Sequence, residues 1–576
     1  MALAVGVPTL LGLRFREQPT GLSRRVFEVI EVLPPGSRVL MAFDFDPASE
    51  GELGPMATAF TRHCAERGHR PVFLCLWPIG EQMIAERIDG VLKADFPAMQ
   101  EGVDYANLGF KSGNEGVIKV ISTDLRQMYP TDRRGIALDQ IPLLRDVTRA
   151  SDFDLIVSVS AGQPGTKEWV LYAATPDDIP IVAGATGVQS PGLYPYTPRQ
   201  LQGLLAAIKG AADYETLVAD KYGDENGRDR EARRRMGPQL FAHLLIIGLI
   251  VAGNIAFARQ RRQPPRPTPG TNPKPGTGPD ERRPWGRPAL LLTLGALAAW
   301  AYVAGNGRAY VSTDAGAVSA ATASETITGQ AVVSMPRTAG LWIAAGMTLA
   351  VFSFLWADNP VYKFAEAILV GVSAAYWMVV AFWTVIVPLV LVPLFPAATH
   401  PLAPGLPPVR EDGWWLTIVP VILGGMLLMR LSPRGGWIAR WPLALIIGTT
   451  AGLKLVGYLQ ADFLSQIRAT AQPLIVTGSG GVVWAETIRA TLLVTATLAA
   501  VGYFFFSAEH RGPMGVVSRL GIWVLMITFG AAFAYTVMGR IALLQIRLEF
   551  LFDDWLWLID PAGGRFALPA AGPPNG

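Results

Sequence analysis

Two aspartates, Asp44 and Asp46, are the residues of this chain whose type and spacing most suggest chemistry. They end the apolar part of VLMAFDFDPASEGEL (39–53), which reads as a buried strand followed closely by a helix. A carboxylate at a strand end can act as a nucleophile, with a second carboxylate as general acid or base and Mg²⁺ balancing the charge. One hypothesis is therefore a hydrolase, a phosphatase in particular, that uses this pair.

The aspartate pair resembles the opening motif of phosphatases of the haloacid dehalogenase type. That family also uses a Ser or Thr ending a second strand, a lysine, and an acidic pair ending a later strand. Ser158 or Ser160 in LIVSVSAG fits the second requirement. The acidic pair is missing, because Asp152 and Asp154 precede that strand and Asp177 precedes the next one. The residues therefore favour an acidic strand end that is structural or contacts a ligand over a phosphatase.

Three further loops place glycines and small polar residues after predicted strands: GFKSGNEG (109–116), SAGQPGTKEW (160–169) and GATGVQSPG (184–192). Such loops present backbone N–H groups to an anion or polar ligand, although ordinary turns also need glycines. None matches a Walker A or dinucleotide fingerprint. The ligand-binding candidates are Asp44, Asp46, Lys111, Asn114, Ser158, Ser160, Gln163, Thr186 and Gln189.

No other nucleophile–base pair is evident. The five histidines are scattered, and the chain has no H-E-x-x-H or C-x-x-C motif. His63 lies on a predicted helix beside Cys64, where a surface or packing role is more common than a catalytic one. Cys64 and Cys75 are too few for a disulfide framework or metal cluster, and we expect half-buried thiols. The sequence predicts no metal site and no cofactor, apart from Mg²⁺ under the hydrolase hypothesis.

Short apolar runs would position the candidate residues. Predicted strands rich in Val, Ile and Leu cover 37–45, 70–77, 105–110, 153–160 and 179–186. Their continuous apolar character suits a sheet buried on both faces. Predicted helices cover 52–67, 80–92, 166–174 and 197–218, the last starting at a Thr-Pro pair. The alternation predicts a Rossmann-like α/β domain with a mainly parallel sheet, whose carboxyl edge gathers the candidates.

The rest of the chain has the composition of a membrane protein. Of the 576 residues 51% are hydrophobic and 16% are charged, against about 25% charged in soluble domains. A net charge of +3 lacks the concentrated basic face of a nucleic-acid binder. Eight apolar runs are expected to span the membrane: 236–258, 289–304, 340–357, 367–395, 414–429, 441–460, 490–507 and 520–539.

These patterns divide the chain into consecutive parts. A short apolar N-terminus (1–13) is expected to be a signal-anchor or a membrane-surface segment, and an α/β domain (14–235) follows it. Next come a transmembrane helix (236–258), a Pro/Arg-rich linker (259–288), a membrane domain of about seven helices (289–539), and an interfacial helix with a tail (540–576).

The arginines predict the orientation. The linker from Arg259 to Arg287 holds eight Lys and Arg, and positively charged loops stay in the cytoplasm. Alternation then makes further basic loops cytoplasmic and leaves the α/β domain outside the cytoplasm. An arginine run just before Met236 is the contrary signal, and a cytoplasmic domain would invert every later loop.

Ionisable residues inside the predicted spans are few. Lys454 lies about six residues from the end of its span, where a lysine usually reaches the interface and only occasionally lines a pathway. Lys363 and Glu366 are three residues apart and are expected to form a local pair. The predicted spans contain no acidic residue, which disfavours the third hypothesis, a transporter or channel subunit.

Three runs, at 43–64, 359–377 and 525–544, resemble uncharacterised prokaryotic polytopic membrane proteins with a membrane-anchored α/β domain. The resemblance implies architecture only, with no activity or catalytic residue. The favoured interpretation is a multi-pass inner-membrane protein whose extracytoplasmic α/β domain binds a ligand or partner. Its bundle would anchor or assemble a complex, as a scaffold. The expected partners are the lipid bilayer, other proteins and a small molecule, but not nucleic acid.

Overall fold

The computed structural model describes residues 1–13, 15, 17–223, 231–261, 299, 303, 307–314, 317–320, 331–355, 357–402, 414–478, 481–507 and 509–558. Nearly all of the predicted linker at 259–288 and of the predicted span at 289–304 lies outside the described residues. The chain divides into two compact units. One unit comprises Met1–Glu17, Gly223–Ala367 and Arg540–Gly576; the other comprises Gln18–Tyr222 and Ile368–Gly539.

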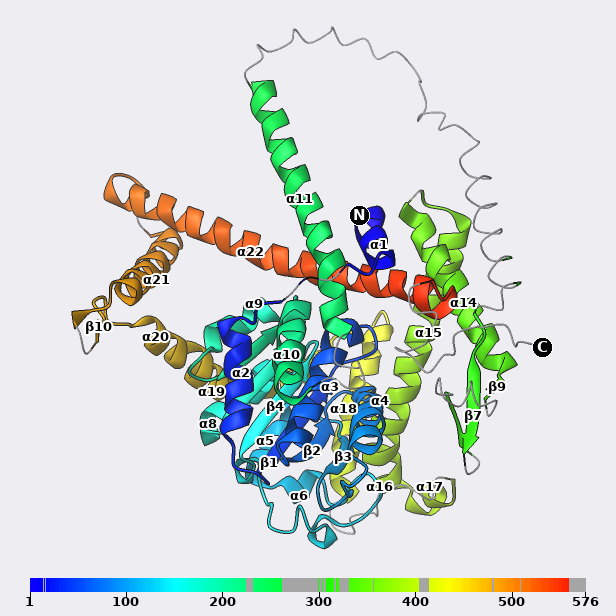
Figure 1. The fold of residues 1–576 in the computed structure, drawn as a ribbon. Helices are drawn as coiled ribbons and strands as arrows, with labels where there is room; N and C mark the ends of the chain where they lie inside the picture. The colour runs from blue at the N-terminus through cyan, green and yellow to red at the C-terminus, as the bar shows by residue number, and fades with distance from the viewer. Residues whose placement is uncertain are drawn as a thin grey trace. The chain divides into compact units, whose positions relative to one another are not determined.

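A six-stranded sheet forms the centre of the α/β domain (Figure 1). Its strands pair in parallel in the order β3-β2-β1-β4-β5-β6. They are β1 (Arg38–Asp44), β2 (Arg70–Cys75), β3 (Ala106–Phe110), β4 (Leu155–Ser160), β5 (Ile181–Ala185) and β6 (Gly203–Ala206). The predicted α/β class is thus confirmed, and all five predicted strands are present.

Helices cover both faces of this sheet, which explains why its strands are apolar on both sides. On one face α10 contacts both α2 and α3, and on the other α5 contacts α7 and its π-helical continuation η4. The bounds of these and the smaller helices are α2 (Gly21–Val32), α3 (Glu50–Glu66), α4 (Gly80–Arg87), η1 (Ile88–Lys93), α5 (Glu115–Thr123), α6 (Leu125–Met128), η2 (Leu138–Gln140), η3 (Ala150–Asp152), α7 (Thr166–Trp169), η4 (Val170–Ala174), α8 (Thr175–Asp177), α9 (Ser190–Leu193), η5 (Tyr194–Tyr196) and α10 (Ala207–Tyr222).

The predicted helix at 197–218 is wrong in its first half. Residues Gly203–Ala206 form strand β6, and α10 begins only at Ala207. The run GLLA is apolar and short, so its local pattern fits a helix turn as well as a strand. Its pairing with β5, in which Val182 aligns with Gly203, makes it a strand.

Six described helices are long and apolar enough to cross a membrane: Glu231–Arg259, Met335–Leu355, Pro360–Leu394, Arg440–Thr470, Trp484–Tyr503 and Pro513–Trp555. A shorter apolar helix covers Trp415–Leu431. Their elements are α11 (Glu231–Arg261), α14 (Met335–Phe352), η6 (Ser353–Leu355), α15 (Pro360–Ala381), η7 (Phe382–Leu391), α16 (Val392–Leu394), η8 (Trp414–Thr417), α18 (Ile418–Leu428), η9 (Met429–Leu431), α19 (Arg440–Gly457), η10 (Tyr458–Leu464), α20 (Ser465–Thr470), α21 (Trp484–Tyr503), α22 (Pro513–Glu549) and η11 (Phe550–Trp555). Seven of the eight predicted spans therefore coincide with an apolar helix.

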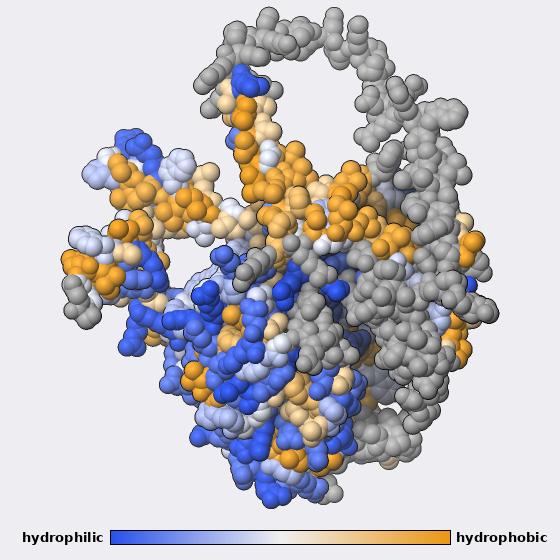
Figure 2. Space-filling model, viewed as in Figure 1, coloured by the Kyte–Doolittle hydropathy of each residue, from blue (hydrophilic) through white to orange (hydrophobic). Residues whose placement is uncertain are grey.

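The surfaces of these helices are apolar, in contrast to the polar surface of the α/β domain (Figure 2). On α22, Trp523, Phe529 and Phe533 are 66%, 69% and 70% exposed. Exposed side chains of this size are costly in water and favourable in lipid. The chain is therefore an integral membrane protein. Residues 540–555, predicted to be a separate interfacial helix, continue α22 into η11 without a break.

The unit that contains the termini is built around α1 (Ala2–Leu10), α11 and the end of α22. Nine residues make α1 about 14 Å long, and it packs against α11. In α11, Arg235 is buried and pairs with Glu231 and Glu549. The same unit contains a three-stranded antiparallel sheet in the order β8-β7-β9; its strands are β7 (Tyr310–Asp314), β8 (Ala317–Ala320) and β9 (Val332–Val333).

Candidate functional site

The carboxyl edge of the sheet is the candidate site, because strand order reverses there between β1 and β4. Strand β1 leads through α3 to β2 on one side, whereas β4 pairs with β1 on the other. Such a switch point is where open α/β sheets bind ligands. Asp44, the last residue of β1, is in register with Ser160, the last residue of β4. The parallel sheet thus brings the predicted strand ends to one edge.

Asp44 lies inside the domain and does not face solvent. Its side chain is 0% exposed. The backbone N–H of Leu76 donates to Oδ1 at 2.6 Å, and the Trp169 indole donates to Oδ2 at 3.3 Å. Burial raises the pKa of Asp44 to about 7, against the opposing effect of these two hydrogen bonds. A phosphoryl group would have to displace Leu76 or Trp169 to meet this carboxylate.

Ser158 and Ser160 are equally enclosed and share one partner. Their hydroxyls lie 3.0 and 2.8 Å from the Thr166 hydroxyl, and the Thr166 backbone N–H donates to Ser160 Oγ at 3.0 Å. All three residues are buried. Glu168 accepts from the Gly165 N–H at 2.9 Å in the same turn. These contacts tie the loop after β4 to the start of α7, so Thr166 organises the turn.

The other candidates lie around this core with more exposure. Lys111 is half-buried, with Nζ 5.8 Å from the centre of the Tyr129 ring, and burial lowers its pKa. The remaining positions are two partly exposed residues (Asp46, Gln189), two exposed ones (Asn114, Gln163) and buried Thr186. Asp46 accepts from the Ser49 N–H at 3.1 Å. Among the described residues, no cluster of three His, Cys, Asp or Glu can hold a metal ion.

Helix α22 contacts two loops of this edge. The hydroxyls of Tyr194 and Tyr535 lie 2.6 Å apart. A Cβ added at Gly187 would meet the Tyr535 carbonyl oxygen at 2.6 Å, so only glycine fits that approach. The Gly187 N–H donates to Glu52 Oε2 at 2.8 Å, and Glu52 is buried at the start of α3. The loop after β5 therefore connects α3 with α22.

The helix formed by α19, η10 and α20 contacts the loops after β3, β4 and β5. Its Lys454 Nζ lies 3.2 Å from Glu115 of α5, so the predicted membrane lysine has a carboxylate partner. One turn further, a Cβ added at Gly457 would lie 2.5 Å from the ring of Tyr172. Asp462 pairs with Lys167 at 3.2 Å and accepts a hydrogen bond from the Tyr196 hydroxyl.

Helix η7 contacts the same edge at one further point. The Ser112 hydroxyl, in the loop after β3, donates to the Thr384 carbonyl at 3.4 Å. The carboxyl edge is thus contacted by three apolar helices that lie far from it in sequence.

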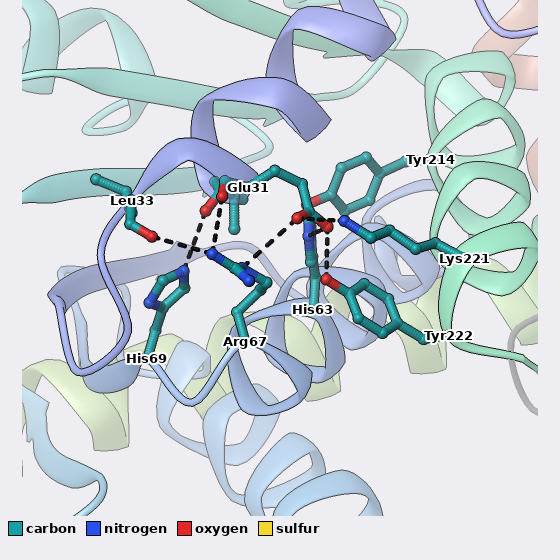
Figure 3. Close-up of polar contacts among 9 residues, drawn as sticks. Glu31, Leu33, His63, Arg67, His69, Tyr214, Lys221 and Tyr222 are labelled. Atoms are coloured by element: carbon teal, nitrogen blue, oxygen red, sulfur yellow. Dashed lines mark hydrogen bonds and ion pairs between the residues drawn. The ribbon is translucent and has the colours of Figure 1, made fainter.

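A second polar cluster lies where α2, α3 and α10 end, away from the carboxyl edge (Figure 3). Glu31 accepts from His63 Nε2 at 3.0 Å and from Lys221 and Tyr222 at 2.5 Å each. His63 Nδ1 lies 2.6 Å from the Tyr214 hydroxyl. Against burial, the hydrogen bonds from Lys221, Tyr222 and His63 hold the pKa of Glu31 at about 2. Burial lowers the pKa of His63 to about 4.

The hydrogen bonds of this cluster join three helices, α2, α3 and α10. His63 is 0% exposed, in agreement with a packing role. Cys64 and Cys75 are free and fully buried, more than the half-burial expected from sequence.

The chain matches no protein-family model, no curated protein sequence and no solved structure.

Sequence reasoning missed Thr166, Trp169, Glu52 and the partners of His63. Thr166 and Trp169 lie within the candidate loop SAGQPGTKEW (160–169), so their proximity to β4 was a usable signal. Glu52 offered no such signal, because its partner Gly187 is 135 residues away.

Proposed function

We propose that this protein is a multi-pass inner-membrane scaffold. Its extracytoplasmic α/β domain would bind a ligand or protein partner, and its helices would hold the domain by the carboxyl edge of its sheet. The observation that carries the proposal is the set of contacts between that edge and three apolar helices. The contacts of Thr384, Asp462 and Tyr535 fall in the carboxyl-terminal half of their helices, and that of Lys454 falls near the middle of its helix.

Alternation supports a common side for these three helix ends. Counting Trp415–Leu431 as a span, Pro360–Leu394, Arg440–Thr470 and Pro513–Trp555 are the first, third and fifth of a series. Alternate spans run in the same direction, so their carboxyl ends emerge on one side of the membrane. The domain contacts Thr384, Asp462 and Tyr535 of these helices.

Lengths along the helices support the same arrangement. At 1.5 Å per residue, Thr384 lies about 36 Å beyond Pro360, Asp462 about 33 Å beyond Arg440, and Tyr535 about 33 Å beyond Pro513. Each distance exceeds the roughly 30 Å of the hydrocarbon core. Lys454 lies only about 21 Å beyond Arg440 by the same rise, so its pair with Glu115 lies nearer the lipid than the contacts of Asp462 do.

The arginines support an extracytoplasmic domain. Arg430 and Arg434 precede the third span of the series and Arg440 begins it, whereas Arg511 precedes the fifth span and Arg519 lies near its start. Both groups are at the ends opposite the domain contacts, and basic loops stay in the cytoplasm. In contrast, residues 471–483 on the domain side contain no Lys or Arg.

The arginine run just before Met236 argues for a cytoplasmic domain, but its weight is smaller in the folded chain than in the sequence. Arg235 is buried and shares two carboxylates, Glu231 and Glu549. It is therefore neutralised within the protein and contributes little to the charge of a loop.

Cysteine labelling tests the orientation. Cys64 and Cys75 are buried, so the native background should be low. Arg145→Cys, exposed on the domain, and Arg434→Cys, exposed before α19, provide two reporters. In cells with an opened outer envelope, an impermeant maleimide should label Arg145→Cys, but should label Arg434→Cys only after lysis. The reverse pattern would overturn the proposed orientation.

Cross-linking tests the docking independently of orientation. Tyr194→Cys and Tyr535→Cys replace side chains whose hydroxyls lie 2.6 Å apart, so a short bis-maleimide should join them in the full chain. The matched control pairs Tyr535→Cys with Arg145→Cys. Equal cross-linking of both pairs would show that the carboxyl edge is not held by α22.

A further inference from the structure

Two arginines share a pocket at the end of the helix that begins at Arg440. The pocket has a volume of about 440 Å³ and is lined by Arg199, Gln200, Ser465 and Arg468. Arg199 belongs to the loop before β6, whereas Ser465 and Arg468 belong to α20. Ligand pockets typically enclose about 300–1,000 Å³, so this one has room for a small polar group.

Hydrogen bonds hold the walls of the pocket in place. The Gln200 amide donates to the Ala461 carbonyl at 3.1 Å and accepts from Gln466 at 3.0 Å. The Arg199 guanidinium donates from Nη1 to the Arg468 carbonyl at 3.0 Å. One nitrogen of the Arg199 guanidinium thus positions the side chain. In the hydrogen bonds of the described residues, its other N–H groups remain available to a ligand.

Among the described residues, no carboxylate forms an ion pair with the arginines of the pocket, Arg199 and Arg468, and the nearby Asp462 is engaged by Lys167 and Tyr196. The last turn of a helix favours a cation, which accounts for Arg468 alone. It does not account for a second arginine from another element in the same pocket.

We propose that this pocket binds a phosphate-type anion between the guanidiniums of Arg199 and Arg468. Arginine presents planar donor pairs that match phosphate oxygens, and Ser465 supplies a neutral hydroxyl on the same wall. The phosphate could belong to the headgroup of an anionic phospholipid or to a soluble phosphorylated molecule. Its binding would link the α/β domain to the membrane helix, because one arginine comes from each.

Two titrations of the delipidated full-length protein in neutral detergent test the proposal and distinguish the sources. Isothermal calorimetry with sodium phosphate, at ionic strength matched with chloride, measures the free anion. Native mass spectrometry with phosphatidylglycerol, compared with phosphatidylcholine, measures the lipid. Arg199→Gln/Arg468→Gln should weaken phosphate or phosphatidylglycerol binding at least about tenfold, since each charge-assisted pair is worth more than a neutral hydrogen bond.

The matched control is Arg24→Gln/Arg25→Gln, which removes two exposed arginines of α2 that are not near the pocket. It should bind as the unmodified protein does. Arg468→Gln alone keeps the bond from Arg199 to the residue 468 carbonyl and serves if the double variant is unstable. If the protein binds phosphatidylglycerol but not free phosphate, the site is assigned to lipid. If it binds free phosphate, the site is assigned to a soluble ligand. Unchanged binding in the pocket variants, or equal loss in the control, overturns the proposal.

Discussion

Asp44 and His63 should give the α/β domain two opposite dependences of stability on pH. The pKa of Asp44 is raised from 3.8 to about 7, and that of His63 is lowered from 6.5 to about 4. Both side chains are fully buried, so solvent screening is small. The fragment Gln18–Tyr222 contains the whole sheet and is the material for this test once circular dichroism and a cooperative urea transition show that it folds.

The sign follows from proton binding in the folded and unfolded chains. Between pH 4 and 6.5, the unfolded chain carries a proton on His63 that the folded chain lacks, so stability rises with pH. Over the same range, the folded chain carries a proton on Asp44 that the unfolded chain lacks, so stability falls. Each slope is about 1.4 kcal/mol per pH unit, and the two nearly cancel.

Single substitutions should therefore reveal the separate pH dependences of stability due to His63 and Asp44. His63→Gln removes the rising contribution and should leave a fall of about 3 kcal/mol between pH 4 and 6.5. Asp44→Asn removes the falling contribution and should leave a rise of about the same size. Each variant is also expected to lose some stability at every pH, because it loses a buried hydrogen bond.

Urea unfolding, followed through the fluorescence of Trp77 and Trp169, measures these free energies. Other titrating groups, such as Glu168 and His69, are common to all variants and cancel in the comparison. The double variant Asp44→Asn/His63→Gln should return to the slope of the unmodified domain. If His63→Gln and Asp44→Asn each keep that original slope, the burial of these groups does not control the pH dependence, and the reasoning is refuted.

Three further predictions concern other buried groups. Thr166→Val leaves the Ser158 and Ser160 hydroxyls without their shared partner and should cost the domain about 1–3 kcal/mol; Thr166→Ser should cost less, and equal losses in urea unfolding would contradict the role of the hydroxyl. Glu549→Gln removes one of the two carboxylates that the described residues place on buried Arg235. It should cost up to about 3–5 kcal/mol of stability, seen as a lower melting temperature in detergent. Arg235→Met/Glu549→Met should recover most of that loss, and no recovery would argue against an uncompensated charge. Finally, the purified chain with Mg²⁺ should not hydrolyse a panel of phosphoesters, because both oxygens of Asp44 are engaged inside the domain; turnover that Asp44→Asn and Asp46→Asn abolish would restore the hydrolase hypothesis.

The sequence was sufficient for the architecture because each element carries its own local signal. Runs such as RVLMAFD and LIVSVS are apolar, β-branched and bounded by polar turns, so they predict buried strands without knowledge of their neighbours. Length and composition likewise predict the long apolar helices from the sequence alone. The parallel class follows from alternation, and it brings Asp44 and Ser160 to one edge.

Only the tertiary structure decided what those residues do there. Asp44 is a buried acceptor because Leu76 and Trp169, 32 and 125 positions away, reach it from other elements. The run GLLA is a strand because it pairs in parallel with β5. The Arg199–Arg468 pocket joins residues 269 positions apart. Local periodicity is a property of each segment, whereas partners and enclosure depend on which segments pack together, and a single sequence carries no direct record of that.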